Sequence, residues 1–520
     1  MKSLLRTGLL TSLLTTVACV AGSDANLSQL WDSSVAAAND GVYVRLPGAE
    51  LVLRITATGS IDRVELDGVN PSSLVTSPDG SRVLVFGSWL ECKDDDDSII
   101  RPEDCQELAR NSVLQIVQDG SLTSEVEIPS HLNTLAFSND GEIAVAYLDY
   151  QNGDDIDVSG FADLGEVAFI RLADGSTGSA SVGFSPSRVL FSPDGQAVVM
   201  SRSQVVAVDL TTFERTLEAP LTLDADQTVD PSGAELAFDA ESGSLTLLLT
   251  VAGSSDLYML DLVSKFWNIG DLGAVPSSVG VDNQSKKTVF SFAGSAKAMV
   301  LNHSNLSTLN ASSLESYTLE EPANQVAIGD GFAVLYNNYN RSVHDVYHLN
   351  LETNQLTEYV VANPVSELQL TQSGSHAVAV LSPENSYGSG IDYYQDSRWG
   401  LAVMDLSSDE SVSLVAETRP VGLALVEGAD TAYALALLEG SETLLQVDLS
   451  NPTQAVPVEL PSPAVAISAM PDGQFVISHD QGLGMISVLD PETLELNTTQ
   501  HFAAIGLLEN SELPRLGEEE

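Results

Sequence analysis

Residues 155–166, with the sequence DIDVSGFADLGE, place oxygen-bearing groups at the spacing of a calcium-binding loop. Calcium takes about six to eight oxygen ligands, and glycine suits the sharp turn at the sixth position of such a loop. Gly160 occupies that position. The candidate ligands are five side chains and one backbone carbonyl, that of the phenylalanine: Asp155, Asp157, Ser159, Phe161, Asp163 and Glu166. The spacing predicts one calcium site, with a solvated acidic turn as the alternative.

Two cysteines bracket a second acidic segment. Cys92 and Cys105 enclose the four aspartates at 94–97. Two cysteines this close together in an exported chain favour a disulfide, with two independent thiols as the alternative. The aspartates have no ligand spacing of their own, so we expect a solvated or loosely cation-binding loop.

A third segment, residues 382–400, carries aromatic side chains beside an arginine. Aromatic residues and arginine are frequent anchors of binding surfaces. The segment is therefore a candidate recognition patch for a protein or a glycan, formed by Tyr387, Tyr393, Tyr394, Arg398 and Trp399. Packing of these side chains against the rest of the fold is the alternative.

Patterns for catalysis are sparse. His344 and His348 would align on a helix as zinc ligands, but the segment HDVYH is predicted to be a strand. The sequence contains no G-x-S-x-G, H-E-x-x-H or P-loop pattern, so no catalytic residue is predicted. Seven histidines are scattered along the chain: His131, His303, His344, His348, His376, His479 and His501.

The charge of the chain limits its partners. The 520 residues include 21 Lys and Arg against 73 Asp and Glu, which gives a formal net charge of −52. Such a surface repels phosphate backbones and anionic lipids, so nucleic acid is not expected as a partner. Because 43% of the residues are hydrophobic, the chain can bury a large core.

The first 18 residues have the composition of a signal peptide, with Lys2 and Arg6 before a short apolar run. The sequence TVAC that ends at Cys19 resembles the lipobox of bacterial lipoproteins, although Thr16 replaces the usual aliphatic residue. That resemblance implies a lipid on Cys19 and a place in the bacterial cell envelope, at the outer membrane or in the periplasm. Cleavage after Ala18 or Ala21 is the alternative. No later segment is apolar for long enough to cross a membrane, so only the lipid would contact one.

A repeated phrase dominates the remaining sequence. SLVTSPDGSRVLVFG (73–87) returns as TLAFSNDGEIAVAYL (134–148), VLFSPDGQAVVMS (189–201), LQLTQSGSHAVAVLS (368–382) and AISAMPDGQFVISH (466–479). Each is an apolar strand, a turn and a second strand, which predicts a hairpin. A second hairpin usually follows, in which the strand ends in Asp or Asn, as in VVAVDLTTFER (205–215) and LAVMDLSSDES (401–411).

Two hairpins per unit predict an all-β fold made of one large β-propeller with four-stranded blades. A β-sandwich would not require the same phrase to return so often. The literal count is nine units, with turns near 80, 141, 195, 242, 284, 331, 374, 428 and 473, and we expect eight to ten blades. We assign residues 19–40 to a linker, 41–508 to the propeller and 509–520 to a flexible acidic tail. The strands in 41–68 are expected to pair with 502–508 and so close the ring.

These SPDG turns and V-x-D-L-x-T strands resemble those of WD40-like bacterial propellers of the TolB and YVTN types. The resemblance covers residues 41–508 and implies the fold, not a function. The stretch DIDVSGFADL resembles the calcium loop of FG-GAP propellers, in which an Asp stands at the position of Ser159. The loss of that charge implies weaker calcium binding. In lactonase-type propellers, Glu, Asn and Asp surround a metal in the central channel.

The long segments 88–112, 149–166 and 382–400 all lie between the second and third strands of their units. By propeller topology they share one face, and long loops commonly carry function. We therefore expect an exported, lipid-anchored propeller that binds a protein or glycan of the envelope without catalysis. A hydrolase of the lactonase or esterase type, with a metal in the channel, is the alternative.

Overall fold

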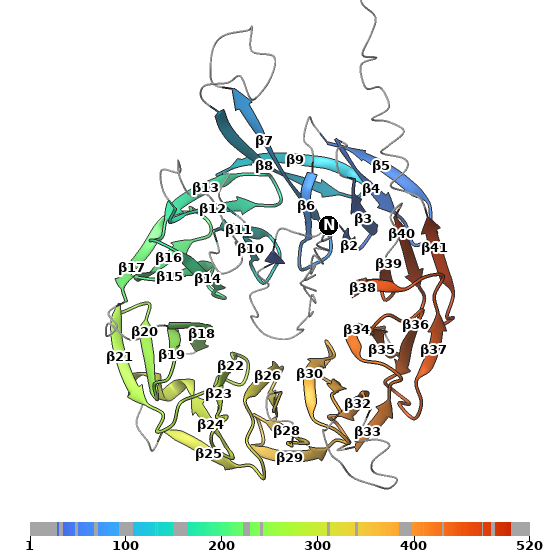
Figure 1. Cartoon of the computed structure of the whole chain (residues 1–520). Helices are drawn as coiled ribbons and strands as arrows, with labels where there is room; N and C mark the ends of the chain where they lie inside the picture. Colours follow the sequence, from blue (N-terminus) through green and yellow to red (C-terminus); the bar gives the residue numbers. More distant parts are fainter. Residues whose placement is uncertain are drawn as a thin grey trace, which may run out of the picture.

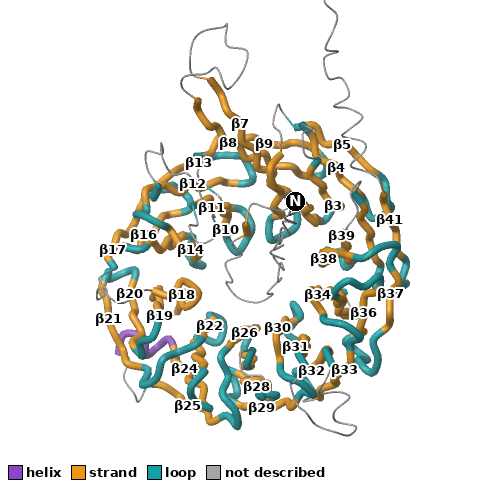
Figure 2. The backbone as a smooth tube through the Cα atoms, viewed as in Figure 1, coloured by secondary structure: helices purple, strands orange, loops and turns teal. Residues whose placement is uncertain are grey.

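The computed structural model of the chain describes residues 29–30, 35–46, 50–66, 71–92, 108–129, 132, 134–148, 164–221, 229–239, 243–308, 313–338, 342–383, 398–408, 410–428, 431–470, 472–479 and 484–500. These residues form an all-β ring of ten four-stranded antiparallel sheets, the blades of a single propeller (Figures 1 and 2). The predicted fold class is confirmed, and the number of blades lies within the predicted range of eight to ten.

Each of the first five blades uses four strands that are consecutive in the chain. Blade 1 contains β2 (Val35–Ala38), β3 (Gly41–Arg45), β4 (Leu51–Ile55) and β5 (Ile61–Glu65); blade 2 contains β6 (Pro71–Thr76), β7 (Val83–Cys92), β8 (Leu108–Gln118) and β9 (Ser121–Ile128); blade 3 contains β10 (Thr134–Phe137), β11 (Ile143–Tyr147), β12 (Glu166–Arg171) and β13 (Thr177–Ser181); blade 4 contains β14 (Pro186–Phe191), β15 (Gln196–Ser201), β16 (Gln204–Asp209) and β17 (Arg215–Pro220); blade 5 contains β18 (Val229–Asp239), β19 (Ser244–Val251), β20 (Asp256–Asp261) and β21 (Phe266–Asp271). A further short strand, β1 (Gln29–Leu30), pairs with β10 at the inner edge of blade 3.

The second half of the ring repeats the arrangement. Blade 6 contains β22 (Ser278–Asp282), β23 (Lys287–Ser291), β24 (Lys297–Asn302), the 3-10 helix η2 (His303–Thr308) and β25 (Leu314–Thr318); blade 7 contains β26 (Gln325–Gly329), β27 (Phe332–Tyr336), β28 (Asp345–Asn350) and β29 (Gln355–Val360); blade 8 contains β30 (Val365–Leu370), β31 (His376–Leu381), β32 (Gly400–Asp405) and β33 (Glu410–Val415); blade 9 contains β34 (Pro420–Glu427), β35 (Ala432–Leu438), β36 (Thr443–Asp448) and β37 (Val456–Glu459); blade 10 contains β38 (Ala464–Ala469), β39 (Phe475–His479), β40 (Met485–Leu489) and β41 (Leu496–Gln500).

The order of the strands gives the ring two different faces. In every blade the first strand is innermost and the fourth lies at the rim (Figure 1). Because neighbouring strands are antiparallel, the connections between the second and third strands emerge on the same face as those between blades. We call this the loop-bearing face. The turns that join the first to the second strand and the third to the fourth lie on the opposite side, which we call the turn face.

The core lies between blades, because the middle strands of a blade are apolar on both sides. All five residues of β11 are buried, and so are the four central residues of β16. Outer strands instead alternate, as in the exposed and buried positions of β17. The middle strands of a blade pack one face against each of the two neighbouring blades, and their sequences are therefore near-continuous apolar runs.

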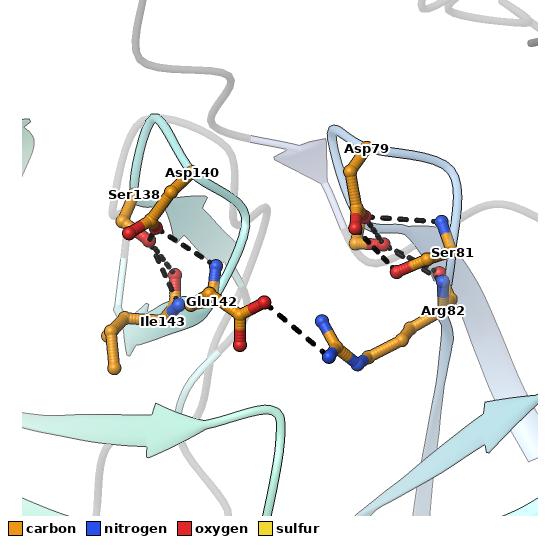
Figure 3. Close-up of polar contacts among 8 residues, drawn as sticks. Asp79, Ser81, Arg82, Ser138, Asp140, Glu142 and Ile143 are labelled. Atoms are coloured by element: carbon orange, nitrogen blue, oxygen red, sulfur yellow. Dashed lines mark hydrogen bonds and ion pairs between the residues drawn. The ribbon is translucent and has the colours of Figure 1, made fainter.

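The SPDG phrase forms the turn between the first two strands of a blade. The Ser77 hydroxyl donates to Asp79 at 2.6 Å, and Asp79 accepts from the Ser81 backbone N–H at 3.1 Å (Figure 3). Gly80 has a φ of +67°, in the left-handed region that favours glycine. The same bond joins Ser138 to Asp140 in blade 3, at 2.6 Å. The aspartates of this phrase therefore hold the turns.

The aspartate that ends many third strands has a similar role in the second hairpin. Asp209 accepts from the backbone N–H groups of Thr211 at 2.8 Å and Thr212 at 2.9 Å. Phe213 lies two residues before β17 and has a φ of +58°, in the left-handed region. Such an Asx turn stabilises a tight hairpin. The same backbone capping recurs at Asp261, Asn350, Asp405, Asp448 and Asp490.

The literal count of nine units was one blade short. The nine counted units correspond to blades 2 to 10, and residues 35–65 form a complete blade before them. This blade begins at Val35, within residues 19–40, for which the sequence predicts a linker. Its first strand, VAAA, consists largely of alanine, which is a weak strand former and gave little signal.

The predicted closure of the ring by strand pairing with residues 502–508 stays a prediction. Within the described part of the chain, the strands of blade 1 pair only with one another, and those of blade 10 do the same; the expected partner, 502–508, lies outside the described residues. The seam between the two blades is an apolar packing interface. Leu53 and Ile55 of blade 1 share one buried cluster with Ile486 and Val488 of blade 10. The first and last blades therefore meet face to face, like any other pair of neighbours.

This seam predicts that a deletion of core volume from it weakens the whole ring. Leu53 is fully buried, and a Leu→Ala change at such a position costs about 2–5 kcal/mol of the free energy of unfolding. We expect Leu53→Ala to fall in that range in a urea or thermal unfolding experiment. Val360→Ala, at a position on β29 that is 64% exposed, should change stability by less than about 0.5 kcal/mol. Equal small effects in both variants would contradict closure through this seam.

Candidate binding face

The three long insertions leave the ring from one kind of connection. Each joins the second and third strands of a blade: β7 to β8, β11 to β12 and β31 to β32. Blades 2 and 3 are neighbours, and blade 8 lies across the ring from them (Figure 1). The insertions therefore start and end on the loop-bearing face, as their positions in the repeat predicted.

The β7–β8 hairpin is longer than the others and projects beyond the ring (Figure 1). Its ladder runs from the pair Val83–Val117 to the pair Cys92–Leu108. Cys92 therefore ends the described part of β7, directly before the acidic insertion. Cys105 and the aspartates at 94–97 lie outside the described residues.

Most of the candidate calcium loop also falls outside the described residues, namely Asp155, Asp157, Ser159, Phe161 and Asp163. Glu166 is described. It is the first residue of β12, pairs with Ser181 of β13 and is half-buried. The twelfth position of the loop is thus fixed to the sheet, at the loop-bearing end of blade 3.

The aromatic segment is partly described. Tyr387, Tyr393 and Tyr394 lie outside the described residues, whereas Arg398 and Trp399 lead directly into β32. The Asn363 side-chain amide donates to the Arg398 carbonyl at 2.8 Å, and the Ala416 N–H donates to the Trp399 carbonyl at 2.8 Å. These bonds fix the backbone of the segment to the connections on either side of blade 8.

The structure adds an arginine that the sequence did not single out. The guanidinium of Arg419 lies over the Trp399 ring, 5.4 Å from its centroid. Arg419 is exposed and belongs to the connection between blades 8 and 9, whereas Trp399 is half-buried. A cation over an indole ring is attracted by the negative face of the ring, by about 0.5–1 kcal/mol at exposed sites. The pair places an aromatic ring and a guanidinium side by side on the loop-bearing face. The chain has only 21 Lys and Arg residues in all.

A single signal in the sequence could have pointed to Arg419. It directly precedes Pro420, the first residue of β34, and so lies in a blade-to-blade connection. Such connections share a face with the long insertions. Periodicity identified the strands but could not show that residues 399 and 419 come together.

The innermost strands carry few charged groups that could serve chemistry. Arg188 of β14 and Glu235 of β18 form an ion pair at 2.8 Å. Glu367 of β30 accepts from the Gln369 side chain at 3.1 Å. Burial, with the nearby Glu367 charge, raises the pKa of Tyr336 to about 12. Within the described residues, no group of three or more His, Cys, Asp or Glu side chains is arranged to hold a metal ion.

The excess of acidic residues is partly explained by the turn face. Burial raises the pKa of Asp79, but hydrogen bonds from Ser77 and Ser81 outweigh it, so the net shift is downward. Arg82 approaches Glu142 of the next blade at 3.6 Å (Figure 3). In the same way, hydrogen bonds from Ser407 and Ser408 outweigh burial and hold the pKa of Asp405 at about 2. These carboxylates stabilise turns and the contact between blades.

The histidine segment HDVYH forms a strand, as predicted. His348 lies within β28, and His344 directly precedes it. Four residues along a strand span about 13 Å, so the pair lacks the helical alignment that a zinc pair of this spacing uses. Within the part of the chain that the structure describes, there is also no helix of the length and apolarity that a membrane span requires.

Comparisons with known proteins support the fold and no more. No protein-family model and no curated protein matches the chain. Solved structures similar to it include a eukaryotic initiation factor (10% identity, 88% of this chain and 94% of that chain, TM-score 0.51), the dihydro-heme d1 dehydrogenase NirN in complex with DHE (12%, 76% and 74%, 0.41) and apo AztD from Citrobacter koseri (12%, 75% and 91%, 0.38). At these identities the likeness shows the propeller fold alone.

Two buried histidines make the ring sensitive to acid. His479 is hydrogen-bonded through Nδ1 to the Ser462 carbonyl at 2.9 Å and through Nε2 to the Ser487 hydroxyl at 2.8 Å. His303 makes equivalent bonds to the Phe238 carbonyl and the Thr288 hydroxyl. Since a carbonyl only accepts, Nδ1 carries the proton in both rings. Burial disfavours the imidazolium and lowers the pKa of both histidines.

This lowering predicts a loss of stability in mild acid. As the pH falls below the ordinary histidine value of 6.5, the unfolded chain takes up protons that the folded chain does not, so the free energy of unfolding decreases. The loss continues down to the pKa of the folded state. We expect the melting temperature to fall between about pH 7 and about pH 5.5, and to fall less in the double variant His303→Gln/His479→Gln. An unchanged slope in that variant would assign the acid sensitivity to other groups.

Proposed function

We propose that this chain is an exported, lipid-anchored propeller that binds a protein or glycan of the bacterial cell envelope through its loop-bearing face, without catalysis. The observation that carries the proposal is the common origin of the three long insertions, beside the fixed pair Trp399 and Arg419. Rigid β-scaffolds commonly bind through long loops of this kind. The repeat phrases support kinship with WD40-like bacterial propellers of the TolB and YVTN types.

The direction of β1 supports an orientation for the anchored protein. Strand β10 leads from the loop-bearing face to the turn face, and β1 is antiparallel to it. The N-terminal end of β1, at Gln29, therefore lies toward the turn face. Cys19 precedes Gln29 by 29 − 19 = 10 residues. A fully extended chain of that length reaches at most about 36 Å. A lipid on Cys19 would thus hold the turn face toward the membrane and leave the loop-bearing face accessible.

The binding proposal predicts that Arg419 contributes to affinity. The protein, immobilised and exposed to its own detergent-solubilised envelope, should retain a protein or glycan that can be purified and titrated. Arg419→Glu should weaken that binding about tenfold, because an exposed cation at an aromatic anchor is replaced by an anion. Arg202→Glu makes the same charge change at an exposed position between β15 and β16 on the same face, and should leave affinity unchanged.

The alternative function, a metal-dependent hydrolase, is tested by an activity assay. Hydrolysis of lactones or esters by the purified chain, abolished by EDTA, would replace the binding proposal with a propeller hydrolase. A loss of binding in Arg202→Glu as large as that in Arg419→Glu would show that overall charge, not the Trp399 site, governs affinity.

Calcium in the loop 155–166 would order the insertion of blade 3. The fixed position of Glu166 at the start of β12 supports this proposal. With serine at the fifth position we expect a dissociation constant of about 10⁻⁴–10⁻³ M, as in extracellular modules. The metal cancels repulsion among the carboxylates.

The calcium site predicts a metal-dependent gain in stability. At ~10 mM calcium the free energy of unfolding should rise by about 1.4–2.7 kcal/mol if the loop opens with the ring. Magnesium should do less, because it requires a tighter octahedral site. Asp155→Ala and Asp157→Ala should abolish the rise in melting temperature, whereas Asp95→Ala should retain most of it. An equal calcium response in the Asp155 variant and the wild type would show that the loop is a solvated acidic turn and not a calcium site.

Processing of the chain predicts two covalent features that mass spectrometry can detect. The N-terminal peptide should carry lipid on Cys19, and Cys19→Ser should release the protein from the membrane fraction. A non-reduced digest should contain Cys92 joined to Cys105, a link that closes a loop for which the chain-entropy model gives about 3 kcal/mol. A soluble protein with an unmodified N-terminus would eliminate the anchor, and two free thiols in exported protein would eliminate the disulfide.

A further inference from the structure

The outer strand of blade 5 differs from the other outer strands of the described ring. β21 exposes Phe266 to 76% and Ile269 to 55%, and Val263 in the preceding turn is 70% exposed. No other described outer strand exposes two large apolar side chains. Most outer strands carry an acidic residue or proline within the strand, which discourages pairing with another strand. In β21 the only charged residue is Asp271, at its end.

The backbone of β21 is available on its outer side. The strand is the last in the sheet order β18-β19-β20-β21, so the described chain provides no strand beyond it. The N–H of Leu272, directly after β21, donates inward to the Ser255 carbonyl at 2.9 Å. Because backbone groups alternate along a strand, those of Trp267 and Ile269 point away from β20. They can accept another strand.

The sector of the ring around β21 carries no formal net charge. Residues 243–308 contain four lysines and four aspartates and no other Asp, Glu, Lys or Arg, so their formal charge is 4 − 4 = 0, whereas the whole chain carries −52. The lysines are Lys265, Lys286, Lys287 and Lys297, and the aspartates are Asp256, Asp261, Asp271 and Asp282. Two copies of this acidic protein would therefore repel each other only weakly where these sectors meet.

We propose that β21 pairs with β21 of a second copy of this chain, in a symmetric antiparallel dimer. A two-fold axis through Asn268 sets the register. It places Trp267 opposite Ile269 of the second copy, and these residues exchange backbone hydrogen bonds. Phe266 then lies opposite Gly270, where it finds room.

The same register brings opposite charges together. Lys265, in the turn directly before β21, then comes near Asp271 at the far end of the other copy's strand. The interface thus contains two apolar cross-strand pairs with residues of opposite charge at each end, and it is self-complementary, as a two-fold interface must be. In Figure 1, which is viewed down the ring, β21 runs along the rim. The two-fold axis is therefore nearly parallel to the ring axis, so both loop-bearing faces point to the same side.

The oligomeric state of the purified full chain tests the proposal. Sedimentation velocity in about 0.15 M salt, where repulsion beyond about 8 Å is screened, should give a monomer–dimer equilibrium. Ile269→Asp should weaken the dimer at least tenfold, because it places an anion beside Trp267 of the partner. Val360→Asp makes the same kind of change at a 64% exposed position on the outer strand β29, and should have no effect. A wild type that stays monomeric, or equal weakening by both variants, would overturn the proposal.

Two further experiments test the register. Lys265→Asp and Asp271→Lys should each weaken the dimer, and the double swap should restore it. The melting temperatures of all three variants show whether the loss of contacts that Lys265 and Asp271 make within one copy has destabilised the fold.

Asn268→Cys places two thiols across the two-fold axis, where Cα atoms about 4.5 Å apart permit a disulfide.

Asn268→Cys should therefore yield a covalent dimer on a non-reducing gel. Ser316→Cys, on the exposed outer strand β25, should not exceed the wild-type background. A dimer that is weakened by Ile269→Asp but not linked by Asn268→Cys would rule out this register, and with it the proposed pairing of β21 with itself.

Discussion

Every blade of this protein depends on its neighbours, because its middle strands are apolar on both sides. A four-stranded sheet alone would leave one such side exposed to water, at a cost of about 25 cal/mol for each Å² of apolar surface. Stacking ten blades in a ring covers both sides of each. The seam between blades 1 and 10, with Leu53 packed near Ile486, supplies the last interface, so the first and last blades have no bare face.

The same arrangement separates stability from recognition. Short turns on one face are held by aspartates such as Asp79 and Asp209, whose carboxylates accept backbone N–H groups. These residues belong to the repeat, so a large acidic excess does not by itself indicate a cation site. The opposite face carries the connections whose length the blade geometry does not restrict. Insertions there leave the interfaces between blades intact, which is why long loops are tolerated at β7–β8 and β31–β32.

A closed ring removes the exposed faces of its sheets but leaves one free edge for each blade. Acidic residues such as Glu125 in β9 and Glu358 in β29 make most of these edges unfavourable for pairing. The high negative charge adds a general repulsion between molecules. Both protections are weak around β21, where we propose that the rim contacts a second copy of the chain.

Features that depend on local chemistry could be predicted from the amino-acid sequence alone. Ser–x–Asp–Gly turns, terminal aspartates and apolar runs specify hairpins within a few residues, so nine of the ten blades and the origin of the insertions could be predicted. Features that depend on residues far apart in the chain become visible only in the folded ring. The alanine-rich β2 is a strand because Ala36 and Ala38 pack against blade 2, and the ring closes by side-chain packing between residues more than 400 positions apart. Arg419 reaches Trp399 only through the path of the chain around blade 8, since contacts between connections follow from the ring and not from any local pattern.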